Sequence, residues 1–198
     1  QLILLNPGRT GGALEFRNIL EKVGVKTKVY IAEAQSLVFA CRIGKSSSVK
    51  IIGIKDFVPV AALPASDTNY VISIIRQLFQ CFVAAPHVLY TSFENIGAIF
   101  HPGIVILNTA KIDKGESFYF YQDVSDVVAD FLIALDKERL QLARAFGLKL
   151  NNIFDWIKVA YPNCNGYNLA ERMRNNPAYY KIKSPKNLSS RLIIEDIT

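Results

Sequence analysis

One of the chain's two histidines, His101, lies in the stretch AIFHPGIVILNTA, between an apolar run and a proline-glycine pair that predicts a turn. An imidazole exchanges a proton near neutral pH, so a histidine at the edge of a core can act as a general acid and base. That role favours a carboxylate on the second ring nitrogen, which fixes the tautomer and stabilises the imidazolium. The alternative is a core histidine whose ring nitrogens bond neighbouring backbone groups. The sequence leaves both interpretations open.

A second candidate is the glycine-rich segment NPGRTGGALEF at residues 6–16, where an apolar run gives way to a helical pattern. Glycines let the backbone approach a ligand closely, and the free N–H groups at a helix start favour a negative or polar group. The segment is not the GxGxxG dinucleotide fingerprint, which occurs nowhere in the chain. It therefore predicts either a ligand-binding loop or a plain turn.

The third candidate is the segment SSRLIIEDIT, in which Arg191 and Asp196 bracket a short apolar run. A guanidinium fork can hold a substrate carboxylate through two parallel hydrogen bonds. The alternative is that both are flanking charges at the start of a strand or a helix.

Composition narrows the function classes. The lysines and arginines behind the net charge of +6 are scattered rather than gathered with aromatic residues, which disfavours nucleic-acid binding. The three cysteines are odd in number and show no CxxC spacing, so neither a disulfide framework nor a metal site is predicted, and a cytoplasmic location is favoured. No apolar run approaches the roughly 20 residues of a membrane span, so we expect no membrane partner.

The first part of the chain has the pattern of an α/β sheet. Residues 1–24 read as a strand, a glycine-rich turn and an amphipathic helix, and residues 25–34 read as a second strand. Together they make the βαβ unit of a parallel sheet. Three further strands and a helix that closes the sheet region are then expected at residues 36–44, 48–55, 57–65 and 66–79.

After about residue 95 the pattern becomes helical. The clearest segment is residues 125–147, with Ser125 or Asp126 as the N-cap and Gly147 after the last turn. Shorter helices are expected at residues 152–161 and 168–175. The sequence therefore predicts an α/β domain at residues 1–95 and an all-α domain at residues 96–198.

Several separated motifs, in family order, resemble the opine dehydrogenases, the octopine and nopaline dehydrogenase group. The resemblance covers essentially the whole chain and rests on NPGRTGGALEF at 6–16, FACR at 39–42, IKDFVPVAALPA at 54–65, SFENIGAIFHPGIVILNTA at 92–110, FYFYQDVSDVVADFLIALDKERLQLARAFGL at 118–148 and RLIIEDI at 191–197. It implies the C-terminal half of a Rossmann-type domain at residues 1 to about 92, followed by part of a helical substrate domain.

The resemblance also implies a reaction, in which the amine of an amino acid joins a 2-keto acid and NAD or NADP, in its reduced form, reduces the resulting imine. By motif position His101 is the family's general acid and base, Asp196 its carboxylate partner and Arg191 the arginine that holds a substrate carboxylate. The candidate cofactor-binding residues are Asn6, Pro7, Gly8, Gly11 and Gly12.

The sequence departs from the family at both ends of the resemblance. The first βαβ unit, with its glycine-rich nucleotide fingerprint, has no counterpart here, and neither has the last part of the helical domain. We therefore expect this chain alone to be inactive and to bind NAD(P)H weakly or not at all. Two alternatives stay open: a non-catalytic interaction subunit or half of a split enzyme, and another two-domain dehydrogenase with a helical C-terminal domain. The oligomeric state is not indicated.

Overall fold

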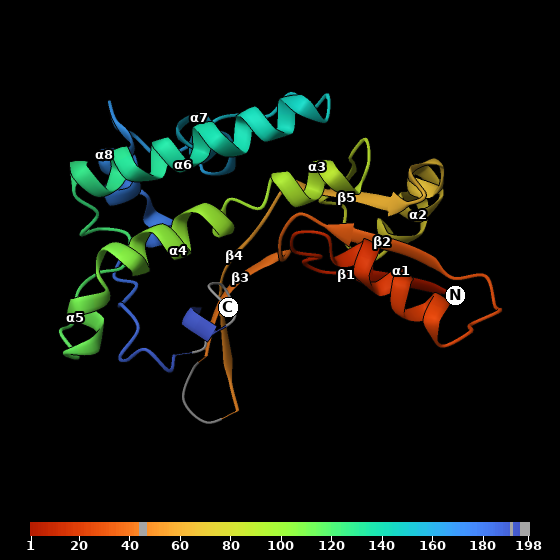
Figure 1. The fold of residues 1–198 in the computed structure, drawn as a ribbon, viewed down its shortest axis with the longest axis horizontal. Helices are drawn as coiled ribbons and strands as arrows, with labels where there is room; N and C mark the ends of the chain where they lie inside the picture. The colour runs from red at the N-terminus through yellow and green to blue at the C-terminus, as the bar shows by residue number, and fades with distance from the viewer. Residues whose placement is uncertain (44–46, 191, 195–198) are drawn as a thin grey trace. The chain divides into compact units, whose positions relative to one another are not determined.

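The computed structural model describes residues 1–43, 47–190 and 192–194. The chain divides into two compact units, Gln1–Asn95 and Ile96–Thr198. The first unit combines β-strands with helices, and helices dominate the second (Figure 1). The predicted fold class, an α/β region followed by a helical region, is confirmed.

A four-stranded sheet forms the centre of the first unit. Its spatial order is β1 (Leu2–Leu5), β2 (Tyr30–Ala34), β5 (Val58–Leu63) and β6 (Phe82–Ala84). Strands β1 and β2 are parallel and are joined by α1 (Gly12–Lys22), which confirms the predicted βαβ unit. Strand β5 is antiparallel to β2 and parallel to β6, so the sheet is mixed. Small and β-branched side chains such as Ala32, Val58 and Val60 are buried on it.

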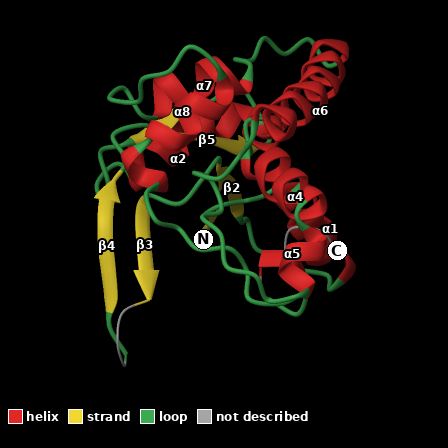
Figure 2. Cartoon of the chain, turned by 90° about the vertical axis from the view of Figure 1, so that its left-hand side faces the viewer, coloured by secondary structure: helices red, strands yellow, loops and turns green. Residues whose placement is uncertain are grey.

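The three further strands expected in the first unit are present, but the expectation for the helix that follows them is wrong. Strands β3 (Phe39–Ile43) and β4 (Val49–Ile54) pair antiparallel with each other as a hairpin separate from the main sheet (Figure 2). The helix α2 (Thr68–Ile75), preceded by a 3-10 turn at Ala65–Asp67, does not close the sheet region, because β6 and α3 (Val88–Phe93) follow it. Strand β6 has only three residues, too few for a periodic pattern to reveal.

The second unit is built from helices of very different length. They are α4 (Gly97–Leu107), α5 (Thr109–Asp113), α6 (Asp126–Ala145), α7 (Ile153–Ala160) and α8 (Leu169–Asn175), with a 3-10 turn at Pro177–Tyr179. Helix α6 begins as predicted, since the Ser125 side chain accepts a hydrogen bond from the Val128 N–H. It ends before Gly147, whose φ of 74° is a left-handed conformation that glycine adopts without strain.

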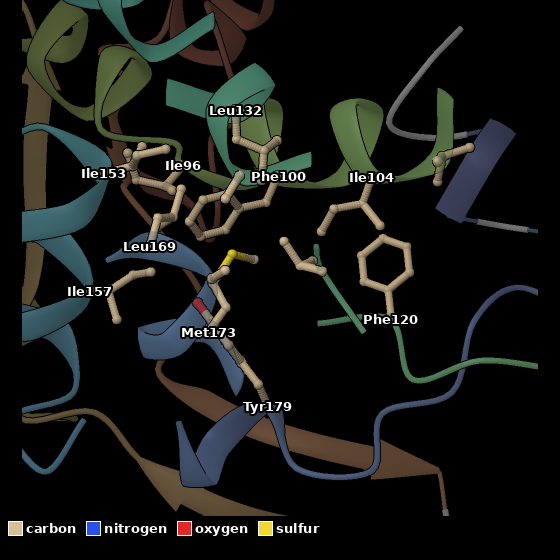
Figure 3. Close-up of a cluster of buried hydrophobic side chains, with 14 of the residues drawn as sticks. Ile96, Phe100, Ile104, Phe120, Leu132, Ile153, Ile157, Leu169, Met173 and Tyr179 are labelled. Carbon is tan, nitrogen blue, oxygen red and sulfur yellow. The ribbon is translucent and has the colours of Figure 1, made fainter. Parts of the chain in front are cut away.

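A single cluster of buried side chains holds these helices together. Helices α4, α6, α7 and α8 each contribute to it, and Phe100 lies between Leu132 and Met173 (Figure 3). All three side chains are at most 2% exposed. Because α4 carries His101 on the same turns that carry Phe100 and Ile104, this core fixes the backbone from which the histidine projects.

The proline-glycine pair after His101 is not a turn, which corrects the sequence-based expectation. Pro102 and Gly103 lie inside α4, and so does His101. A Cβ on Gly103 would stand 2.5 Å from Leu132 Cδ2 of α6, closer than van der Waals contact permits. Glycine is therefore required for the close approach of two helices rather than for a reversal of the chain.

We expect Gly103→Ala to destabilise the protein by about 1–3 kcal/mol, because the added methyl group must displace Leu132 in a fully packed core. Thermal denaturation followed by circular dichroism measures the effect. The control is Gly53→Ala in β4, where a Cβ would meet nothing within 4 Å. Equal melting temperatures for the two variants would contradict the close helix contact.

Candidate active site

His101 projects from α4 toward a group of aromatic side chains within the second unit. Its Nε2 atom lies 2.9 Å from the hydroxyl oxygen of Tyr121, in the segment that precedes α6. The Phe120 ring lies 6.0 Å from the imidazole, edge to face. Both His101 and Tyr121 are partly exposed. His101 is thus not buried in the core, and its Nε2 faces a hydroxyl group.

The Tyr121 ring is held by a buried neighbour. It stacks on Tyr179 with the ring centroids 4.1 Å apart and the planes 18° from parallel. Burial, together with the nearby Tyr161 and Tyr121, raises the pKa of Tyr179 well above the usual value for tyrosine. Tyr179 therefore stays a neutral phenol across the working pH range and gives Tyr121 a fixed apolar surface.

Two loops far apart in the sequence lie side by side to bring these aromatic residues together. The Phe120 N–H donates to the Ile182 carbonyl at 2.7 Å, and the Ser184 N–H donates to the Phe118 carbonyl at 2.8 Å. Tyr119 and Lys183 form an isolated antiparallel bridge between the same segments. This short ladder fixes the segment before α6 against the segment after α8, and so places Tyr121 on Tyr179.

The glycine-rich loop connects β1 to α1 in the first unit. The Gly8 N–H donates to the Ala34 carbonyl at 3.0 Å, and the Gly11 N–H donates to Ser92 Oγ at 3.0 Å. A Cβ on Gly8 would stand 2.3 Å from the Glu33 Cβ, so glycine is required there by packing. The buried Oδ1 atom of Asn6 accepts no hydrogen bond from the described residues. Two N–H groups of the loop, those of Gly8 and Gly11, are therefore already bonded within the unit, while the Asn6 side chain keeps an unused acceptor.

Glu33 is a residue that the sequence analysis missed. Its side chain is 1% exposed, and its Oε2 accepts a hydrogen bond from the Ala13 N–H at the start of α1 at 2.9 Å. Its Oε1 accepts hydrogen bonds from the hydroxyl groups of Thr91 and Ser92 in α3. The available signal was an acidic residue inside the apolar strand YIAEA, because a buried carboxylate requires several donors. Glu33 joins β2, α1 and α3 and shapes the glycine-rich loop.

We expect Glu33→Gln to lower the free energy of unfolding by about 1.5–3 kcal/mol, because an amide cannot accept at both positions that the carboxylate fills. Urea denaturation measures the loss. The matched control is Glu15→Gln in the exposed first turn of α1, where the change should be within about 0.5 kcal/mol. An unchanged midpoint for the Glu33 variant would show that the carboxylate does not organise the loop.

Two further candidate residues, Arg191 and Asp196, lie outside the described residues. Among the residues that are described, no three histidine, cysteine or acidic side chains gather into a possible metal site. None of the helices formed by this part of the chain is long and apolar enough to cross a membrane. Within the described residues, His101 with its tyrosine partner is the arrangement best suited to proton transfer.

Comparison with known proteins gives consistent matches. Residues 84–198 match the family described as NAD/NADP octopine/nopaline dehydrogenase, alpha-helical domain. The opine dehydrogenase of Arthrobacter sp. (strain 1C) is 36% identical over 199 residues, which cover 100% of this chain and 55% of that protein. The chain therefore spans about half the length of this relative.

Solved structures of octopine dehydrogenase share the fold. One, a complex with NADH and L-arginine, has a TM-score of 0.77, and another, with NADH and pyruvate, has a TM-score of 0.73. Both are 22% identical in sequence and cover 99% of this chain, and the match extends over 55% and 53% of those chains. The two units therefore adopt the fold of the corresponding part of these proteins.

Proposed function

Because this chain belongs to the octopine/nopaline dehydrogenase family, we propose that it is part of an enzyme that joins an amino acid to a 2-keto acid and reduces the product with NADH or NADPH. The observation that carries the proposal is the family match over residues 84–198, a range that includes His101 and its aromatic neighbours. In domain terms, residues 1–95 form part of the Rossmann-type domain and residues 96–198 part of the helical substrate domain.

His101 is the general acid and base of this reaction. The amine adds to the keto group to give a carbinolamine, whose hydroxyl group leaves as water once an acid protonates it. The same group, as a base, activates water when the imine is hydrolysed in the reverse direction. A partly exposed imidazole can perform both steps near neutral pH, and its contact with Tyr121 leaves it in reach of solvent.

Arg191 and Asp196 complete the proposed site. Arg191 holds a substrate carboxylate, because a guanidinium binds such a group through two parallel hydrogen bonds. Asp196 orients His101 and stabilises the imidazolium that forms during the reaction. Both roles rest on the position of these residues in the motif RLIIEDI.

The glycine-rich loop is proposed to face the cofactor through Asn6. This residue follows the carboxyl end of β1, the edge of a parallel β-strand pair where α/β proteins bind ligands. Its unpartnered Oδ1 suits a hydroxyl or amide donor of the cofactor. Pro7, Gly8, Gly11 and Gly12 shape the loop behind it. The cofactor supplies the hydride, and the protein holds the carbon that receives it.

The test is an assay of the whole protein that carries this segment. We expect consumption of NADH or NADPH only when an amino acid and a 2-keto acid are both present, with a secondary amine detected by mass spectrometry as the product. Consumption with the keto acid alone, at the same rate, would identify a simple keto-acid reductase and contradict the proposal.

A further inference from the structure

The hydroxyl group of Tyr121 has a position that its own ring dictates. A phenol oxygen lies on the ring axis, so the ring plane and position determine where the hydroxyl stands. Here the ring is fixed on one side by stacking on the buried Tyr179 and on another by the edge of Phe120, whose centroid is 4.9 Å away. The 2.9 Å contact with His101 Nε2 is therefore made to a rigid group, not to a mobile surface side chain.

The chemistry of this contact constrains the imidazole. A phenol hydroxyl can donate to a bare Nε2 or accept from Nε2–H, according to the tautomer of the neutral ring. When the imidazole is protonated, Nε2–H donates to the hydroxyl oxygen. A hydroxyl partner thus keeps its hydrogen bond in both protonation states.

We propose that Tyr121 is a positioning residue for His101, whose imidazole ring it holds in one orientation through its hydroxyl group. The consequence for catalysis rests on the proposed function: the ring that exchanges the proton points in a fixed direction.

Nuclear magnetic resonance of the ¹⁵N-labelled chain tests the proposal without an activity assay. The chain has only two histidines, so His87→Gln assigns the ring signals of His101. The ring nitrogen shifts above neutral pH report the balance between the Nδ1–H and Nε2–H tautomers. Tyr121→Phe keeps the stacked ring and removes only the hydroxyl, and it should shift this balance in His101, because the hydrogen bond between Nε2 and the hydroxyl group is lost. The matched control is Tyr180→Phe, an exposed tyrosine that neighbours Tyr179 in sequence, which should leave the signals unchanged.

Unchanged His101 signals in Tyr121→Phe would overturn the positioning role, whether or not the whole enzyme is active as proposed. In the whole enzyme the same variant should lower kcat about tenfold with little change in KM, because the reacting group is misoriented rather than the substrate released. A shifted tautomer together with full activity in both Tyr121→Phe and His101→Gln would leave the positioning role standing and would contradict the proposed function instead.

Discussion

Replacement of His101 by glutamine is expected to lower kcat by roughly a hundredfold to ten-thousandfold in the whole enzyme that carries this segment. Glutamine has a similar reach and retains polarity, but it cannot accept and return a proton near neutral pH. Cofactor affinity should scarcely change, because the proposed contact with the cofactor is made by Asn6 and not by His101. Steady-state kinetics with saturating NADH or NADPH measure the loss.

The melting temperature distinguishes this outcome from a purely structural role. His101 is partly exposed, so we expect the variant to unfold within a few degrees of the wild type. His87→Gln serves as the matched control, since His87 lies at the start of α3 and has no place in the proposed mechanism. A large fall in melting temperature with an unaltered kcat would show that His101 is a structural histidine of the core and not the general acid and base.

The largest effect on stability is expected at a buried ion pair in α6. The Oδ1 atom of Asp136 lies 2.7 Å from the Nε atom of Arg139, and the two side chains are 3% and 7% exposed. Asp136 also accepts from the Ile153 N–H at the start of α7, and Arg139 donates to the Asn151 carbonyl. Asp136→Ala should lower the free energy of unfolding by about 3–5 kcal/mol, because the guanidinium is left buried without its carboxylate.

Calorimetry or urea denaturation measures this loss, and a surface pair provides the control. In α1 the Nε atom of Arg17 lies 3.0 Å from the Oε1 atom of Glu21, but these side chains are 47% and 63% exposed. Glu21→Ala should cost less than about 1 kcal/mol, because water screens the pair. Similar losses for the two variants would show that burial does not govern the strength of the Asp136 contact.

Local patterns predicted the elements that are regular and long. The strand, turn and helix at the start of the chain follow from an apolar run, glycines and an amphipathic stripe, and α6 follows from its cap and its periodicity. Strand β6 is too short to produce a pattern, and the pairing of β3 with β4 alone depends on contacts that no local rule encodes.

The candidate site was predictable only in part, because the residues that contact His101 come from distant segments of the sequence. His101 stands out by residue type, and the family resemblance supports it. Its contact with Tyr121 depends on loops that meet through Phe120 and Ile182, more than sixty residues apart in the sequence. The proline and glycine after His101 predict a turn by local rules, but the approach of α6 to α4 determines the outcome instead.

The pH dependence of kcat, measured on the wild-type enzyme and on His101→Gln, tests the central claim most directly. If His101 is the acid and base of imine formation, the wild-type profile contains a limb that reports imidazole titration, and the variant loses that limb along with most of its activity. A variant that keeps the same limb at a similar kcat would contradict the claim, because the titrating group would then be another residue.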